Sequence, residues 1–165
     1  MLRLAGLALC ASALVATTVE AKPSRKEFLQ QEVVALTQLC VGAGFDAGKV
    51  ASGLAKRGYE IKDWYGANMI GINAPGTKGP AGIIIYMPRS NPCGSVQVAP
   101  VRIPLVTGTM AATLSQMGYE QVGKGDQRLS RWKRGASNVR IDSHFSVNIG
   151  AGTGQSGIAI RPDTE

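Results

Sequence analysis

The sequence VASGLAKRGYE at 50–60 returns, sixty positions later, as MAATLSQMGYE at 110–120. Identical residues stand at Ala51 and Ala111, Leu54 and Leu114, Gly58 and Gly118, Tyr59 and Tyr119, and Glu60 and Glu120. Each copy is typical of a short helix that ends at a glycine, because glycine adopts the left-handed backbone found just after many helices. A strand-and-turn pattern follows each copy. We therefore expect an α+β fold of two tandem helix-plus-antiparallel-sheet units in one domain, as partial repeats at about 46–104 and 106–162.

The first 21 residues are typical of a signal peptide. Arg3 precedes an apolar run, 4–15, which is too short to span a bilayer, and small residues precede the expected cleavage point after Ala21. A lipoprotein site at Cys10 is the alternative, but such a site needs a small residue where Leu9 stands. We expect the segment 22–165 to be a periplasmic or secreted single domain without a transmembrane segment.

The two cysteines after the signal peptide, Cys40 and Cys93, are expected to form a disulfide, as cysteine pairs in exported proteins usually do. Closing a loop of this length contributes about 4 kcal/mol on the chain-entropy model. A catalytic thiol or a pair of metal ligands are the alternatives. The sequence has one histidine and no Cys-x-x-Cys, and its acidic residues are scattered, so we expect no metal and no cofactor.

Capping signals place three helices. Ser24 and Glu27 have capping-box spacing, so an extra N-terminal helix is expected over about 25–40. Asp46 is expected to cap the helix of the first unit. In the second unit, Thr107 or Thr109 is expected to cap a helix that ends at Met117.

Extended segments are expected at 59–64, 68–73, 81–87, 95–103, 119–122, 127–134, 138–148 and 158–161. We expect the second and third of these to form one hairpin, and the sixth and seventh another, around Gly135. Ile83-Ile84-Ile85 is apolar on both faces, which predicts a place at the centre of the sheet. The last segment is expected to close the sheet.

Basic residues crowd around one tryptophan in the later hairpin. The candidate binding residues there are Arg128, Arg131, Trp132, Lys133, Arg134 and Arg140. Guanidinium groups around an aromatic ring suit phosphate, an acidic glycan or an acidic protein surface, and the net charge of +7 agrees with an anionic partner. Nucleic acid fits the chemistry but not an exported compartment. The alternative is a solvated basic face with Trp132 in the core.

A second candidate anchor is the pair Trp64 and Tyr65, since Trp and Tyr are frequent in interface hot spots. The same pair equally suits a lid over a small core. The segment 152–157 matches Gly-x-Gly-x-x-Gly, but a strand and not a helix is expected after it, so a hairpin turn explains it better than a phosphate site.

Asp142, His144 and Ser146 are the residue types of a hydrolytic triad, and strand alternation predicts one face for all three. Residues two apart on a strand are about 7 Å apart, so His144 serves both neighbours poorly. No Gly-x-Ser-x-Gly elbow is present. The solvent face of a half-buried strand is the simpler interpretation.

These patterns favour an exported, non-catalytic binding or interaction module of the bacterial periplasm or cell envelope. The layout of two helix-plus-sheet units resembles small exported inhibitor proteins of bacteria, of the beta-lactamase-inhibitor type, in arrangement only and without a shared motif. The expected partner is a protein or an anionic envelope component. A small hydrolase using His144, or a lipid or glycan binder acting through the basic hairpin, is the alternative.

Overall fold

The computed structural model describes residues 23–59, 61–64, 67–70, 83–85, 93–98, 102–125, 128–147 and 155–164. Its elements are α1 Arg25–Gly42, α2 Ala47–Lys56, β1 Ile61–Trp64, β2 Ala67–Ile70, β3 Ile83–Ile85, β4 Gly94–Val98, α3 Ile103–Gln116, β5 Glu120–Val122, β6 Leu129–Arg134, β7 Ser137–Val147 and β8 Gln155–Pro162. Helices together with antiparallel sheet confirm the α+β class. The expected signal peptide and its cleavage point lie outside the described residues and stay predictions.

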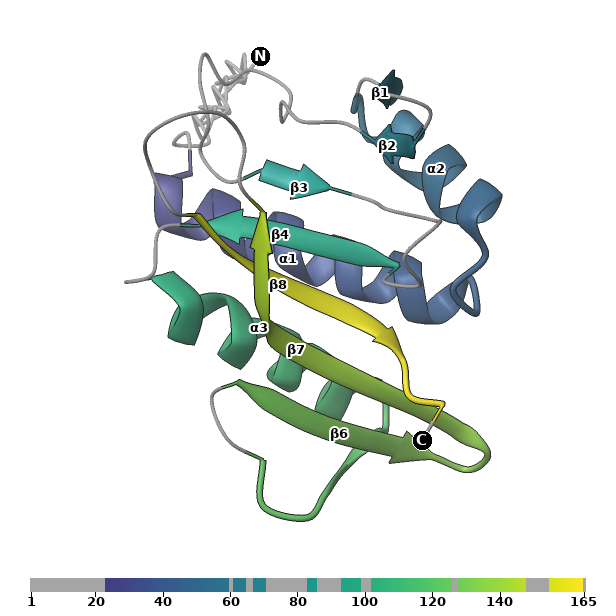
Figure 1. Cartoon of the computed structure of the whole chain (residues 1–165), viewed down its shortest axis with the longest axis vertical. Helices are drawn as coiled ribbons and strands as arrows, with labels where there is room; N and C mark the ends of the chain where they lie inside the picture. Colours follow the sequence, from purple (N-terminus) through teal and green to yellow (C-terminus); the bar gives the residue numbers. More distant parts are fainter. Residues whose placement is uncertain are drawn as a thin grey trace, which may run out of the picture.

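The strands form one six-stranded antiparallel sheet, ordered β3-β4-β8-β7-β6-β5, and a separate pair, β1-β2. In Figure 1, α1 and α3 lie behind the six-stranded sheet, on the same face of it. No described helix covers the opposite face, which we call the open face. The sheet therefore has one face that can form a core and one that can meet solvent or a partner.

The core lies between the sheet and the helices α1 and α3. The sheet contributes the buried residues Trp132, Val139, Ile141, Ile158 and Ile160. The helices contribute Leu29, Val33, Leu36, Val106, Met110 and Leu114. Cys40, in the last turn of α1, is bonded to Cys93, which directly precedes β4, with 5.6 Å between their Cα atoms. The predicted disulfide is confirmed, and it joins the central helix to the sheet.

The predicted helix starts at Ser24 and Asp46 are confirmed. Ser24 and Glu27 form a complete capping box, and Lys49 N–H donates to Asp46 Oδ1 at 2.9 Å. The repeated stretch forms the same helix end twice. Gly58 and Gly118 have φ of 85° and 80°. In the first copy Tyr59 N–H donates to the carbonyl of Leu54, and in the second Tyr119 N–H donates to that of Leu114.

The expected start of the second-unit helix is wrong. Helix α3 begins at Ile103, after Arg102, and has no side-chain cap. Thr107 and Thr109 lie inside it, and their hydroxyls donate to the carbonyls of Ile103 and Leu105 at 3.0 and 2.7 Å. Because a threonine hydroxyl can be satisfied within a helix, its presence did not mark the helix start. The strand expected through Ile103 accordingly ends at Val98.

Strand pairing differs from the expectation at three places. β2 pairs with β1 and not with β3, and β3 stands at one end of the six-stranded order and not at its centre. β8 does not close the sheet, because it lies between β4 and β7. The hairpin of β6 and β7 is confirmed, with Arg134 paired to Ser137 across the two-residue turn that begins at Gly135.

Candidate functional site

The predicted basic hairpin divides between the two faces of the sheet. Arg131 is paired with Arg140, whereas Trp132 is paired with Val139, a core residue. Because side chains alternate along a strand, Arg131, Lys133 and Arg140 belong to the open face and Trp132 to the helix side. Trp132 is only 7% exposed, and its indole N–H donates to Ser130 Oγ at 3.0 Å. Trp132 therefore lies in the core, as the alternative interpretation had it, and is not part of the basic surface.

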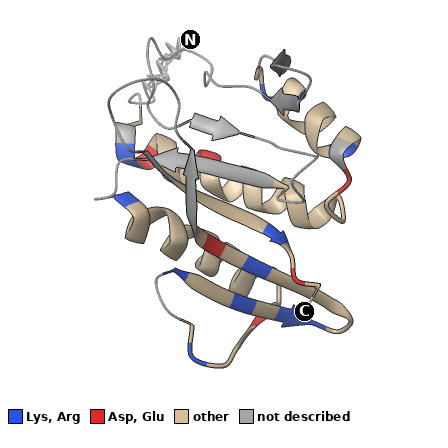
Figure 2. Cartoon of the chain, in the orientation of Figure 1, with Lys and Arg blue, Asp and Glu red and all other residues tan. Residues whose placement is uncertain are grey.

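A row of three arginines crosses the open face. Arg131 of β6 is in register with Arg140 of β7, which is in register with Arg161 of β8. Adjacent strands are about 4.8 Å apart, so these side chains lie next to one another. Their exposed fractions are 42%, 19% and 26%. We call Arg131, Arg140 and Arg161 the arginine row; Figure 2 shows the basic residues of these three strands gathered at one end of the sheet.

Two carboxylates already lie within the arginine row. Asp163 Oδ2 is 3.3 Å from Arg131 Nε, and its Oδ1 is 3.8 Å from Arg140 Nη1. Asp142 forms an ion pair with Arg161. The Asp163 side chain is only 7% exposed. Three guanidinium groups thus meet these two carboxylates, and Arg131, Arg140 and Asp142 make further interactions besides, on a surface whose geometry suits oxygen anions.

Sequence reasoning missed Arg161 and Asp163 as parts of this surface. Arg161 stands alone in Ile160-Arg161-Pro162, and nothing near it in the sequence suggests a charge cluster. Only the register of β8 against β7 brings it beside Arg140. Had the pairing of β8 with β7 been recognised, the alternation of both strands would have placed the two arginines on one face.

The surroundings of the row are basic, with one exposed apolar side chain. Between Glu120 and Asp163 the sequence has seven Lys and Arg residues against four Asp and Glu. Val122 is paired with Arg131 and is 51% exposed. Lys133 is exposed on the same face, and Arg128 is exposed directly before β6. This end of the open face therefore combines several charged residues, with Glu120 in register with Lys133, and a small apolar contact.

Arg134 acts on the helix side of the sheet. Its Nη1 donates to the carbonyl of Met117 at 2.8 Å, and its guanidinium carbon lies 4.8 Å from the centre of the Tyr119 ring. Cations at the end of a helix satisfy its last carbonyls and oppose its dipole. Arg134 therefore stabilises the end of α3 and does not extend the arginine row.

A second polar cluster is buried between α1 and the end of α2. Glu32 accepts hydrogen bonds from the Tyr59 hydroxyl and from Arg57 Nη2, the latter at 2.8 Å. Burial, with the bond to Glu32 as the next cause, raises the pKa of Tyr59 well above its ordinary value. Glu32 thus has two donors, and the cluster connects α1 with the end of α2.

The expected alternation of Asp142, His144 and Ser146 is interrupted. The register of β7 against β8 shifts by one residue between Asp142 and Phe145, as in a β-bulge. Asp142 is engaged by Arg161. The side chains of His144 and Ser146 are not among those the structure describes. The backbone of β7 therefore does not provide one regular strand face for a triad.

Two further expectations fall outside the description. Trp64 is the last residue of β1, but its side chain and the whole of Tyr65 are not described, so the second anchor stays a prediction. The first half of the glycine-rich segment 152–157 is likewise outside the described residues, and its second half begins β8. Where side chains are described, no group of three or more His, Cys, Asp or Glu residues could hold a metal ion.

No protein-family model, curated protein or solved structure matches this chain. None of the described helices is long and apolar enough to cross a membrane.

Proposed function

We propose that the chain is an exported, non-catalytic interaction module of the bacterial periplasm or cell envelope, and that it binds an acidic protein surface through the arginine row and Lys133. The observation that carries this proposal is the register of Arg131, Arg140 and Arg161 on three neighbouring strands, on the face of the sheet that no described helix covers. Such a row spans three strands and presents several guanidinium groups at once, which suits a protein partner better than a small ligand.

The chemistry of the row favours carboxylates. Arginine presents a planar fork of donors that matches a carboxylate, and Asp142 and Asp163 already occupy part of the row. The exposed Val122 beside Arg131 adds an apolar contact of the kind that protein interfaces use. The layout of the sequence suggested an inhibitor-like role. In that form of the proposal, the basic face covers an acidic site on another protein.

We also infer that the chain consists of two related units. The same glycine-tyrosine helix end opens each unit, and the sheet order places β4 and β8, the last strand of each, side by side. β3 and β7 then flank them on either side. An arrangement of this kind is expected when two similar units pair through equivalent strands.

The experiment compares two charge-matched double variants of the purified exported chain on immobilised poly-L-glutamate. Arg131→Gln with Lys133→Gln removes two charges from the open face. Lys49→Gln with Lys56→Gln removes two from exposed positions on or near α2. The first variant should elute at clearly lower salt than the native chain, and the second should elute like it, because only the first changes the binding surface.

Equal elution of both variants would contradict the proposal, since net charge alone would then explain retention. Lys133→Gln by itself leaves the ion pairs of the row intact and covers the case in which the double variant fails to fold. Vesicles of phosphatidylglycerol form the second arm. Binding of the native chain to these vesicles but not to poly-L-glutamate would favour the lipid-binding alternative over a protein partner.

A further inference from the structure

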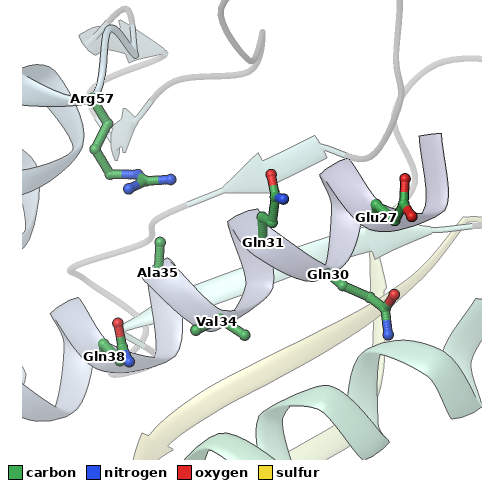
Figure 3. Close-up of a pocket in the computed structure, with 7 residues that line it drawn as sticks. All are labelled: Glu27, Gln30, Gln31, Val34, Ala35, Gln38 and Arg57. Carbon is green, nitrogen blue, oxygen red and sulfur yellow. The ribbon is translucent and has the colours of Figure 1, made fainter. Parts of the chain in front are cut away.

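A groove lies along the outer side of α1, away from the sheet. Its volume is about 650 Å³, and it is lined by Glu27, Gln30, Gln31, Val34, Ala35, Gln38 and Arg57. Six of these residues come from α1, and Arg57 reaches in from the end of α2. In Figure 3, Arg57 extends toward α1, where Gln31 and Ala35 face it. At 1.5 Å per residue the stretch from Glu27 to Gln38 is about 16 Å long.

The lining combines polar and apolar surface and carries no excess charge. Three of the side chains are glutamines, each of which offers both donors and an acceptor. Glu27 and Arg57 carry opposite charges, and each is already engaged. Glu27 accepts from the N–H of Ser24 at 2.8 Å, and Arg57 donates to Glu32 at 2.8 Å. The groove therefore favours a neutral ligand with many groups that can both donate and accept hydrogen bonds.

Val34 and Ala35 are the apolar residues of this lining. A pyranose ring has the complementary surface, because its C–H groups form an apolar face and its hydroxyls point outward. The helix that carries the groove is held in place at its capping box and by the disulfide of Cys40. The backbone of the site is thus preorganised, which lowers the cost of binding.

We propose that this groove binds a neutral oligosaccharide, with the glutamine amides pairing to hydroxyl or acetamido groups and Val34 and Ala35 contacting the ring face. The site is separate from the arginine row, since it lies on a helix surface and the row lies on the open face of the sheet. A glycan held here would give the chain a second ligand, independent of any acidic partner.

The test is an NMR titration of the ¹⁵N-labelled full exported chain with chitotetraose, a neutral oligomer of N-acetylglucosamine, and with maltotetraose. Saturable shifts are expected in the backbone amides of 27–38 and of Arg57. Gln31→Ala with Gln38→Ala should weaken binding about thirtyfold, because each of the two lost hydrogen bonds contributes about 1 kcal/mol. The matched control is Gln116→Ala, an exposed glutamine of α3, which should leave the affinity unchanged.

Three results would overturn the proposal: no saturable shift with either sugar at about 10 mM, shifts that map elsewhere, or an unchanged affinity in the double glutamine variant. Binding should also persist at about 0.5 M salt, where contacts between exposed charges are screened. Loss of sugar binding at that salt would contradict a neutral ligand. The native titration is decisive even where a variant fails to fold.

Discussion

At the scale of single residues, Glu32 is a carboxylate buried in the core, and its two partners explain why it is tolerated. A buried charge without partners would cost several kcal/mol, which is about the whole stability of many domains. Here the Tyr59 hydroxyl and Arg57 both donate to it. Tyr59 belongs to the repeated stretch, and its counterpart Tyr119 instead shares a 2.8 Å hydrogen bond with Ser137. The same repeated tyrosine therefore fixes a different neighbour in each copy.

Stability should fall at alkaline pH because of Tyr59. Its pKa is raised in the folded protein by burial, so the folded state keeps a proton that the unfolded chain releases above about pH 10. The unfolded chain is then favoured, and the free energy of unfolding decreases by about 1.4 kcal/mol per pH unit from this group. Urea denaturation from about pH 8 to about pH 11 should show this extra slope.

Tyr59→Phe is the control for this effect. It should cost about 1–3 kcal/mol near neutral pH, because Glu32 loses a donor. The difference in stability between the native chain and the variant should then shrink as the pH rises above about 10. A difference that stays constant over this range would show that Tyr59 is not protected from ionisation in the fold.

Residue types alone could not locate the candidate site. The basic residues of the hairpin were visible in the sequence, but which of them share a face depends on pairing between distant strands. Arg161 lies in the row only because of the register of β8 with β7. Trp132 lies on the other face because side chains alternate along β6. The groove on α1 was not expected either, since exposed glutamines on a helix form no recognisable chemical motif.

At the scale of elements, the glycines that end helices differ from those inside them. Gly118 follows α3 with φ of 80°, and a Cβ there would lie 3.7 Å from Arg134 Cδ, an ordinary contact. The strain of a substitution would therefore come from the backbone. Gly118→Ala should lower stability by about 1–2 kcal/mol.

Gly108, inside α3, provides the matched comparison. No atom lies within 4 Å of the position where its Cβ would stand. Gly108→Ala should therefore raise stability by up to about 1 kcal/mol, through the better helix propensity of alanine. Thermal unfolding of both variants measures the two effects. Changes of the same sign would contradict the assignment of Gly118 as a left-handed helix end.

Helix starts were predicted correctly where a side chain caps the first turn, and not elsewhere. Ser24 and Asp46 marked helix starts correctly because their side chains bond the first backbone N–H groups. α3 has no such cap, so its start at Ile103 left no signal, and the threonines inside it gave a misleading one. The order of the strands depends on long-range pairing, and β8 could not be placed between β4 and β7 from sequence pattern alone.

At the scale of the whole molecule, the disulfide and the β4–β8 pairing meet at one place. Cys93 is bonded to Cys40 of α1, and its backbone N–H donates to the carbonyl of Ile160 in β8 at 3.0 Å. α1 is thereby attached to the interior of the six-stranded sheet, where β4 pairs with β8. The covalent bond and the sheet reinforce each other at this junction.

Replacing both cysteines by alanine should therefore destabilise the whole molecule by about 2–4 kcal/mol, because the unfolded chain regains the entropy of a long open loop. Alanine avoids placing a new polar group at two buried positions. Urea denaturation measures the loss, and hydrogen exchange should show the earliest added opening in α1 and β4, the elements that the bond joins. A reducing agent should destabilise the native chain by a similar amount and leave the double variant unchanged. A loss well below 1 kcal/mol would mean that packing alone holds α1 on the sheet, with the disulfide as a minor addition.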